Sequence, residues 1–285
     1  MYTEFRPSKF QRLQFYLNYY FDYYSPFIKK HRMEMEKTIS IKNSKKSKTA
    51  LVLANGPSVN KLDQKKIQAL HDKGEFDVWA LNFFLLSELS ESIVPDFYCL
   101  SDGKFFDSET DLDPLLAEKI QKINKKVKEL NIPVFIPVHR LGDKNPFSKY
   151  YPFNDYEDFP SINVSDITKP RGYVTMTAYK ALSIAIYLGY DQIYIAGFDN
   201  DYFKKYFVDK DNTIFLKDDH FYDSKGSDTL VKAPQADGRT IGEHLHSIHF
   251  LFKHLEKFKK FNIINLDPVG LVDCFSKHHN LDVYK

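Results

Sequence analysis

The sequence has few cysteines, no long apolar run and almost no net charge, and each shortage excludes a class of protein. Two cysteines in 285 residues, Cys99 and Cys274, fit a reducing cytoplasm better than a disulfide-stapled scaffold. No apolar run is long enough to span a bilayer, and no signal peptide is recognisable. A formal net charge of only +2 argues against a nucleic acid as the partner. We therefore expect a cytoplasmic protein with a core of its own.

The familiar glycine-rich phosphate loops are also missing, yet one short turn stands where such a loop would be. The apolar run 50–54 reads as a buried strand and stops at Asn55, Gly56, Pro57 and Ser58. A helix-compatible stretch follows from Leu62. In α/β proteins a strand that ends in a glycine turn before a helix offers backbone N–H groups to a phosphate or base. With one glycine and no Gly-Lys-Ser/Thr, the turn suits a ligand with a modest phosphate load.

The near-neutral total charge hides a basic N-terminal segment, residues 1–48. It carries 11 Lys/Arg against 4 Asp/Glu, a net of +7, which leaves −5 for the rest of the chain. Its aromatic and aliphatic side chains fall on one helical face, formed by Phe10, Leu13, Leu17, Tyr20, Phe21 and Tyr24. The segment ends in 42–48, which reads as a solvated linker. Two roles fit this amphipathic helix: residues 1–32 attach to the inner membrane surface, or the helix docks on the domain or on a second copy in a homo-oligomer.

The rest of the chain, 49–285, alternates between strand and helix patterns. Expected strands are 50–54, 77–82, 97–102, 133–138, 192–197 and 262–266, and expected helices are 115–130, 175–188 and 241–258. Residues 140–170 read as a long, lid-like loop, and 199–238 as irregular. This alternation predicts an α/β fold with a mainly parallel sheet covered on both faces.

Polar residues stand at four of the expected strand ends. Ligands of such sheets bind beyond the carboxyl ends of the strands, so these residues should share one pocket. They are Asn55, Asn82, Ser101 with Asp102, and Asp199.

The order and spacing of these motifs resemble the bacterial sialyltransferases of glycosyltransferase family 42 and a related group of polysaccharide-biosynthesis proteins. The resemblance covers about residues 49–275. It rests on the turn at Asn55, on Asn82, on the run Leu-Gly-Tyr-x-x-Ile-Tyr-x-x-Gly-x-Asp over 188–199, and on Asn-Leu-x-Pro over 265–268. It implies a single Rossmann-like domain of the GT-A type. It also implies an inverting transferase that moves sialic acid or a similar sugar from a CMP-activated donor, without a metal, to a surface glycan such as lipopolysaccharide or capsule, or to its lipid-linked precursor.

The resemblance assigns roles to individual residues. Asn55 and Asn82 would face the nucleotide, Tyr202 and Tyr206 would donate hydroxyl hydrogen bonds to the leaving phosphate, and His220 would be the general base. Thr175 and Thr177 would contact the donor. An imidazole suits deprotonation of a sugar hydroxyl, and a phosphate with one charge needs no metal to leave.

Three positions depart from the family pattern, so the identity of the transferred sugar is not determined by the resemblance. Ala178 stands where the family has glycine, Arg171 lies a few residues off the family's arginine, and Ser101-Asp102 replaces an asparagine.

Other functions remain open from sequence. Asp199-Asn200-Asp201 is an Asp-x-Asp after a strand, the pattern of metal-dependent transferases that use nucleotide-diphosphate sugars. The spacing of His246 and His249 would also suit a metal, whereas Asp111-Leu-Asp113 is better explained as a helix cap. Similar Asn-Gly-Pro-Ser turns occur in pterin diphosphokinases, which transfer pyrophosphate from ATP. An inert nucleotide-binding or scaffold protein is the remaining alternative.

Overall fold

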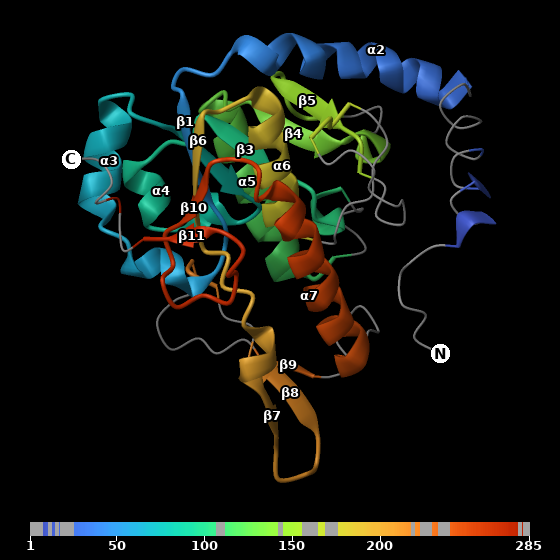
Figure 1. The fold of residues 1–285 in the computed structure, drawn as a ribbon, viewed down its shortest axis with the longest axis vertical. Coiled ribbons are helices and arrows are strands. Elements are labelled where there is room, and N and C mark those ends of the chain that lie inside the picture. The colour runs from blue at the N-terminus through green and yellow to red at the C-terminus, as the bar shows by residue number, and fades with distance from the viewer. Residues whose placement is uncertain are drawn as a thin grey trace.

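A central parallel sheet of eight strands organises the chain in the computed structural model (Figure 1). The structure describes residues 8–10, 13–14, 17, 26–106, 112–141, 145–155, 165–168, 176–217, 220–222, 230–232, 240–278 and 281. The strand order is β11-β10-β6-β1-β2-β3-β4-β5, and every neighbouring pair runs parallel. The strands are β1 (Thr49–Leu53), β2 (Asp77–Leu81), β3 (Phe97–Cys99), β4 (Val134–Pro137), β5 (Tyr150–Phe153), β6 (Gln192–Ala196), β10 (Ile263–Asn265) and β11 (Ser276–Lys277). The α/β, Rossmann-like fold class predicted from sequence is confirmed.

The order of the strands creates a switch point beside β1. From β1 the chain adds strands outward to β5, then crosses back to place β6 on the other side of β1. The two halves of the sheet therefore diverge between β1 and β6. In open α/β sheets this divergence opens a crevice at the carboxyl ends of the strands, where ligands bind.

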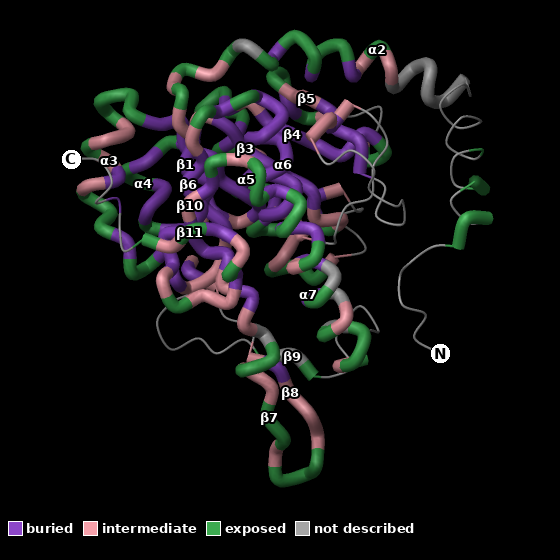
Figure 2. Tube along the Cα trace, viewed as in Figure 1, coloured by how far each residue is buried: buried purple, intermediate pink, exposed green. Residues whose placement is uncertain are grey.

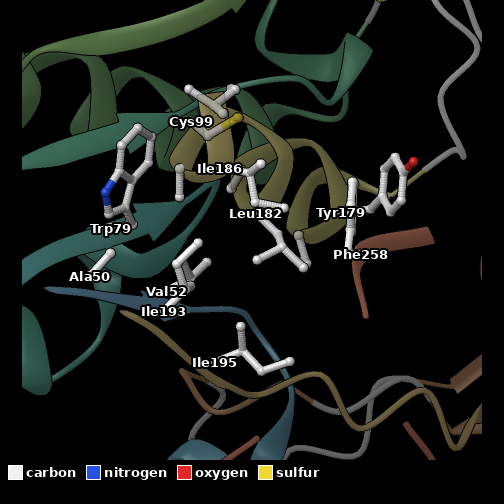
Figure 3. Packing of buried hydrophobic residues seen from close by; sticks show 14 of the residues in the cluster. Ala50, Val52, Trp79, Cys99, Tyr179, Leu182, Ile186, Ile193, Ile195 and Phe258 are labelled. Atoms are coloured by element: carbon white, nitrogen blue, oxygen red, sulfur yellow. The ribbon is translucent and has the colours of Figure 1, made fainter. Parts of the chain in front are cut away.

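Helices cover both faces of the sheet, as the alternation predicted. They are α2 (Pro26–Ser40), α3 (Gln64–Asp72), α4 (Leu89–Ser92), α5 (Pro114–Glu129), α6 (Thr177–Leu188) and α7 (Ile241–Leu255). Side chains of α6 and α7 pack with Ala50 and Val52 on one face, and those of α3, α4 and α5 pack with Leu51 and Leu53 on the other. Because consecutive strand residues point to opposite faces, the whole apolar run of β1 is buried. Figure 3 shows the first cluster and Figure 2 its burial.

The helix ends follow local signals in the sequence. Helix α6 contains no glycine or proline and stops at Gly189, whose φ of 75° is the left-handed conformation common at helix ends. Helix α5 begins after Asp113, whose carboxylate accepts from the N–H groups of Leu115 and Leu116. The interpretation of Asp113 as a helix cap is thus confirmed.

Short 3-10 helices connect several of these elements. They are η1 (Ile41–Asn43), η2 (Pro57–Lys61), η3 (Phe84–Leu86), η4 (Gly103–Phe105), η6 (Val138–Arg140), η7 (Tyr202–Lys205) and η8 (Glu256–Phe258).

Two expected irregular regions contain strands instead. The region 140–170, predicted as a lid-like loop, includes β5, which pairs with β4 at the edge of the sheet. The region 199–238 includes an antiparallel sheet of β7 (Tyr206–Val208), β8 (Ile214–Lys217) and β9 (Leu230–Lys232), which projects from the body in Figure 1. Strands of three or four residues are too short to show a periodic pattern, and β8 contacts the body little, so sequence alone did not reveal them.

The N-terminal segment from residue 32 onward packs on the domain. Met35, Thr38 and Ile41 are buried, and the Glu34 carboxylate accepts a hydrogen bond from the hydroxyl of Tyr150 on β5 at 2.7 Å. The segment 44–48, expected to be a solvated linker, is docked as well: the backbone N–H of Lys46 donates to Asp77. Helix α2 therefore covers the edge strand β5, and the linker, although exposed at Lys46 and Lys48, is held to the domain through its backbone.

The predicted amphipathic face is only partly within the described residues. Phe10, Leu13 and Leu17 are exposed, whereas Tyr20, Phe21 and Tyr24 lie outside the description. The division of the chain at residue 48 stays a prediction. Among the described helices, none combines the length and apolarity needed to cross a membrane.

Candidate functional site

The loops after β1 and β6 meet at the switch point through two glycines. The N–H of Gly56 donates to the carbonyl of Gly197 at 3.0 Å. A Cβ on Gly56 would lie 2.6 Å from that carbonyl oxygen, and one on Gly197, whose φ is 74°, would lie 2.6 Å from the carbonyl of Ala54. Only glycine permits this approach at either position. The Asn55-Gly56-Pro57-Ser58 turn is therefore held against the end of β6.

Two backbone donors of this turn, the N–H groups of Gly56 and Ser58, are already engaged, contrary to the expectation that they face a phosphate. The N–H of Ser58 donates to Asp199 Oδ2 at 2.9 Å. The turn enters the 3-10 helix η2 first, and α3 begins only at Gln64, with its N-terminus capped by the Asp63 carboxylate. No α-helix N-terminus opens at the turn, so a ligand phosphate needs other positive groups.

A pocket of about 250 Å³ lies at the switch point and supplies those groups. Its charged lining consists of three carboxylates and three lysines, Asp199, Asp201, Asp267, Lys61, Lys204 and Lys205. Pro57, Ser58, Val269 and Gly270 complete it. The formal charges cancel, and Asp201 is paired with Lys205 at 3.2 Å. The pocket therefore presents both acceptors and cations to a ligand.

Asp199 is the carboxylate most perturbed by this environment. Burial raises the pKa of Asp199 above its ordinary value, and the negative charges of Asp267 and Asp201 raise it further, against the hydrogen bonding of Ser58. A bound group that donates hydrogen bonds would stabilise the ionised form of the Asp199 carboxylate.

Three buried acceptors at the ends of three adjacent strands have no hydrogen-bond partner among the described residues. They are the amide oxygens of Asn55 after β1 and Asn82 after β2, and Oδ1 of Asp199 after β6. Buried polar atoms in folded proteins are nearly always hydrogen bonded, and an unpaired one costs about 1–3 kcal/mol. Unpaired acceptors gathered on one edge of the sheet therefore point to a ligand that donates hydrogen bonds there.

Asn82 also anchors a second polar cluster beside the pocket. Its side-chain N–H donates to Thr177 Oγ1 at 3.1 Å, and that hydroxyl lies 2.8 Å from Ser101 Oγ. Asn82 has a φ of 40°, a left-handed conformation that asparagine tolerates better than most residues. The structure thus brings together Asn82, Ser101 and Thr177 from β2, β3 and α6. Asp102 instead accepts from the N–H of Lys104 and caps η4.

His220 lies on a short segment that returns to this edge of the sheet. The N–H of the next residue, Phe221, donates to the carbonyl of Asn55 at 3.1 Å. The His220 ring stacks on Tyr222 with centroids 5.0 Å apart, and Tyr222 packs against Phe83, the residue after Asn82. His220 therefore belongs to the same region as Asn55 and Asn82, as its predicted role requires.

The other predicted residues are less closely tied to the pocket. Tyr202 begins η7 directly after the pocket residue Asp201. Tyr206 begins β7, where it pairs with Leu216, and does not line the pocket. Thr175 lies outside the described residues.

Four charged residues of the pocket lining were not predicted from sequence, namely Lys61, Lys204, Lys205 and Asp267. Asp267 was recognisable in principle, because it directly follows Leu266 at the end of the predicted closing strand. The lysines were not, because lysine is common on surfaces and only the folded chain places these three together.

The alternative metal sites suggested by the sequence do not form a cluster of metal ligands among the described residues. Within the described ranges, no group of three or more His, Cys, Asp or Glu side chains is placed to hold a metal ion, and this includes Asp199 with Asp201 and His246 with His249.

The fold defines the class of the protein as a doubly wound, Rossmann-like α/β protein. Comparison with known proteins does not narrow this class: no protein-family model matches the chain. A search of curated proteins likewise gave no significant match. Function must therefore be argued from the crevice itself.

Proposed function

We propose that the protein is an inverting glycosyltransferase that moves sialic acid or a similar sugar from a CMP-activated donor to a surface-glycan acceptor. The observation that carries the proposal is the set of unpaired acceptors of Asn55, Asn82 and Asp199 at the switch-point crevice. A nucleoside offers amino and hydroxyl donors to such acceptors, while lysines of the pocket offer charge to its phosphate. The sequence resemblance to the family 42 transferases supports the choice of CMP.

The charge balance of the pocket supports a monophosphate over a diphosphate. Three lysines face three aspartates, so the lining adds no net positive charge. The phosphodiester of a CMP-activated donor carries one negative charge, and CMP leaves with two after the sugar C–O bond breaks, one fewer than a departing nucleoside diphosphate, so hydrogen-bond donors can stabilise it. A leaving diphosphate usually recruits a divalent metal. In the proposed reaction His220 takes the proton of the acceptor hydroxyl, and the pocket lysines stabilise the leaving phosphate; the roles of Tyr202 and Tyr206 as further donors to it rest on the family resemblance alone.

Calorimetry of the full chain with CMP, UDP, GDP and ATP, each with and without magnesium, tests the donor. We expect CMP to bind most tightly and without magnesium. Tighter binding of UDP that depends on magnesium would replace the proposal with a metal-dependent transferase that uses nucleotide-diphosphate sugars. Tighter binding of ATP with magnesium would favour a pyrophosphate transferase of the pterin diphosphokinase kind.

We also propose that the N-terminal segment brings the enzyme to lipid-linked acceptors at the inner membrane face. Phe10, Leu13 and Leu17 are 74%, 56% and 49% exposed, and the net charge of +7 over residues 1–48 favours anionic lipid. Sedimentation with anionic vesicles should pull down the full chain more than a chain that begins at residue 26, which lacks the three exposed apolar side chains but keeps +6 of the charge. A change from oligomer to monomer without vesicle binding would instead assign the segment to self-association.

A further inference from the structure

Asp267 is a buried carboxylate that lines the pocket opposite the turn after β1. It follows β10 and is only 4% exposed. Its Oδ1 accepts from the N–H of Val269 at 3.2 Å, and its own N–H donates to Asn265 Oδ1 at 3.0 Å. A Cβ on Gly270 would lie 2.4 Å from Asp267 Oδ2, so a larger residue there would require the carboxylate to move. The loop after β10 therefore fixes this carboxylate in one position.

Asp199 presents a matching arrangement from the neighbouring strand β6. Its Oδ2 accepts from Ser58, while its Oδ1 is buried without a partner among the described residues. The hydrogen bond to Asp267 goes to Oδ1, and within the described ranges no donor reaches its Oδ2, which is not among the fully buried unpaired atoms. Each carboxylate thus has one oxygen held by the protein and one left over, and both line the same pocket.

The rest of the lining limits what these two oxygens bind. Lys61, Lys204 and Lys205 in the same pocket disfavour a cation, and the two carboxylates disfavour an anion next to them. Ionised carboxylates only accept hydrogen bonds, so their partners must be neutral donors. A ligand with paired hydroxyls at one end and an anionic group at the other satisfies both halves of the pocket.

We infer that Asp199 and Asp267 together bind the 2′,3′-diol of a ribose, so that the pocket selects ribonucleotides over deoxyribonucleotides. The inference rests on the proposed function in taking a nucleotide as the ligand. Beyond the proposed function, the inference names the ribose as the part of the nucleotide that is recognised. It also gives a role to Asp267, to which the family resemblance assigns none. Carboxylates at strand ends hold ribose hydroxyls in other doubly wound proteins, for the same reason of acceptor geometry.

Calorimetry of the unaltered full chain with CMP, 2′-deoxyCMP and 3′-deoxyCMP tests the inference directly. Each deoxynucleotide should bind at least about tenfold more weakly, because a buried charged acceptor is left without its donor. Binding of both deoxynucleotides within threefold of CMP would overturn the inference and leave the proposed function standing.

The variant Asp267→Asn assigns the effect to this residue. It keeps an oxygen for the N–H of Val269 but replaces the second acceptor with a donor. We expect the preference for CMP over 2′-deoxyCMP to fall to within about threefold, since the discriminating acceptor is lost. The matched control is Asp273→Asn, which removes the same charge from an exposed carboxylate of the same loop, outside the pocket lining, and should keep the preference. An unchanged preference in Asp267→Asn would overturn the assignment, and if this variant does not fold, the deoxynucleotide comparison still decides.

The nucleotide panel separates failure of the inference from failure of the proposed function. If UDP or ATP binds in place of CMP and its 2′-deoxy form binds at least tenfold more weakly, the ribose site stands and the CMP assignment falls. If no ribonucleotide binds at millimolar concentration, both are overturned.

Discussion

The two edges of the parallel sheet differ in whether their buried polar groups have hydrogen-bond partners. At the amino-terminal edge, the Asp77 carboxylate accepts from Lys46 N–H at 3.0 Å and from the Tyr190 hydroxyl at 2.7 Å. Asp96 nearby is bonded by His71, by Lys46 and by the N–H of Val78. At the carboxyl-terminal edge, acceptors of Asn55, Asn82 and Asp199 have no partner among the described residues. A satisfied network stabilises the fold, whereas unsatisfied acceptors await a ligand.

The same strands thus end in hydrogen-bonded polar groups at one edge of the sheet and in unpaired acceptors at the other. Stability demands partners for every buried polar group, so a cluster that lacks them is retained only where something outside the chain supplies them. Substitutions at the two edges should therefore separate stability from ligand binding, and the predictions below are ordered from the largest expected effect to the smallest.

His220→Ala at the carboxyl-terminal edge should abolish turnover and spare binding. A general base contributes about 10²–10⁴-fold to rate and little to ground-state affinity. We expect sugar transfer to fall by that factor while the Kd for CMP stays within about threefold. Retention of more than a tenth of wild-type activity at neutral pH would exclude His220 as the base.

Truncation tests how far the amino-terminal edge depends on the N-terminal segment. Removal of residues 1–46 takes away the buried Met35 and Ile41 and the Lys46 contact to Asp77. Burial of each such side chain contributes about 1.5–3 kcal/mol, so the free energy of unfolding should fall by several kcal/mol. A chain that begins at residue 26 is the control and should unfold in urea at the wild-type midpoint. Equal midpoints for the two truncations would show that the segment 26–46 is not part of the core.

Tyr190→Phe should destabilise the protein without changing nucleotide affinity. The substitution removes a donor to Asp77 and an acceptor for the Trp79 indole N–H, which is 3.3 Å away. Leaving these buried groups short of a partner costs about 1–3 kcal/mol. Tyr151→Phe is the matched control, because no described group hydrogen bonds to that hydroxyl. Urea unfolding measures both variants, and an equal effect of the two would contradict the role of the Tyr190 hydroxyl.

Asn55→Ala should have the opposite signature, weaker binding with no loss of stability. Its amide oxygen has no partner among the described residues, so removing it is neutral or stabilising by up to about 1 kcal/mol. The Kd for CMP should rise about tenfold, as expected for a lost hydrogen bond to a ligand. Asn131→Gly, at an exposed turn with a φ of 52°, is the control and should change neither quantity. Loss of stability with unchanged affinity would place Asn55 on the structural side of the comparison.

Acid titration provides a smaller test of the amino-terminal edge. Burial works to raise the pKa of Asp96, but hydrogen bonds from His71, Lys46 and Val78 outweigh it and hold the pKa below its ordinary value. The resulting stabilisation is complete above the unfolded pKa of about 3.9 and is lost as the pH falls through the lower folded value. The stability difference between wild type and Asp96→Asn should therefore narrow below about pH 4. A constant difference across the acid range would show that the charge of Asp96 contributes nothing.

The sequence was a good guide where a local pattern has a local cause. Apolar runs identified β1, β2 and β6, because strands buried on both faces are apolar after their first residue. The absence of helix breakers and the terminal Gly189 located α6 to within two residues. Asn55, Asn82 and Asp199 were found from their position alone, since the carboxyl ends of parallel strands must share one edge.

Other features depend on contacts between residues far apart in the chain. The strand β5 is identified only by its pairing with β4, and the docked segment 44–48 only by partners such as Asp77 and Glu75. The same is true of the pocket lysines, which resemble any surface lysine in the sequence and are identified only because the folded chain places Lys61 and Lys204 in the lining of one pocket.

The sequence by itself determined the alternation of strands and helices, and with it a parallel sheet whose polar strand ends share an edge, because hydrophobic periodicity is a local property of the chain. The tertiary structure alone decided which backbone donors of the turn are free, and it showed that Asp199 already occupies that of Ser58. It also decided that Asp267 and Asp199 line one pocket. Both depend on how β6, β1 and β10 are brought side by side, and hydrogen bonding between distant segments leaves no periodic trace in the sequence.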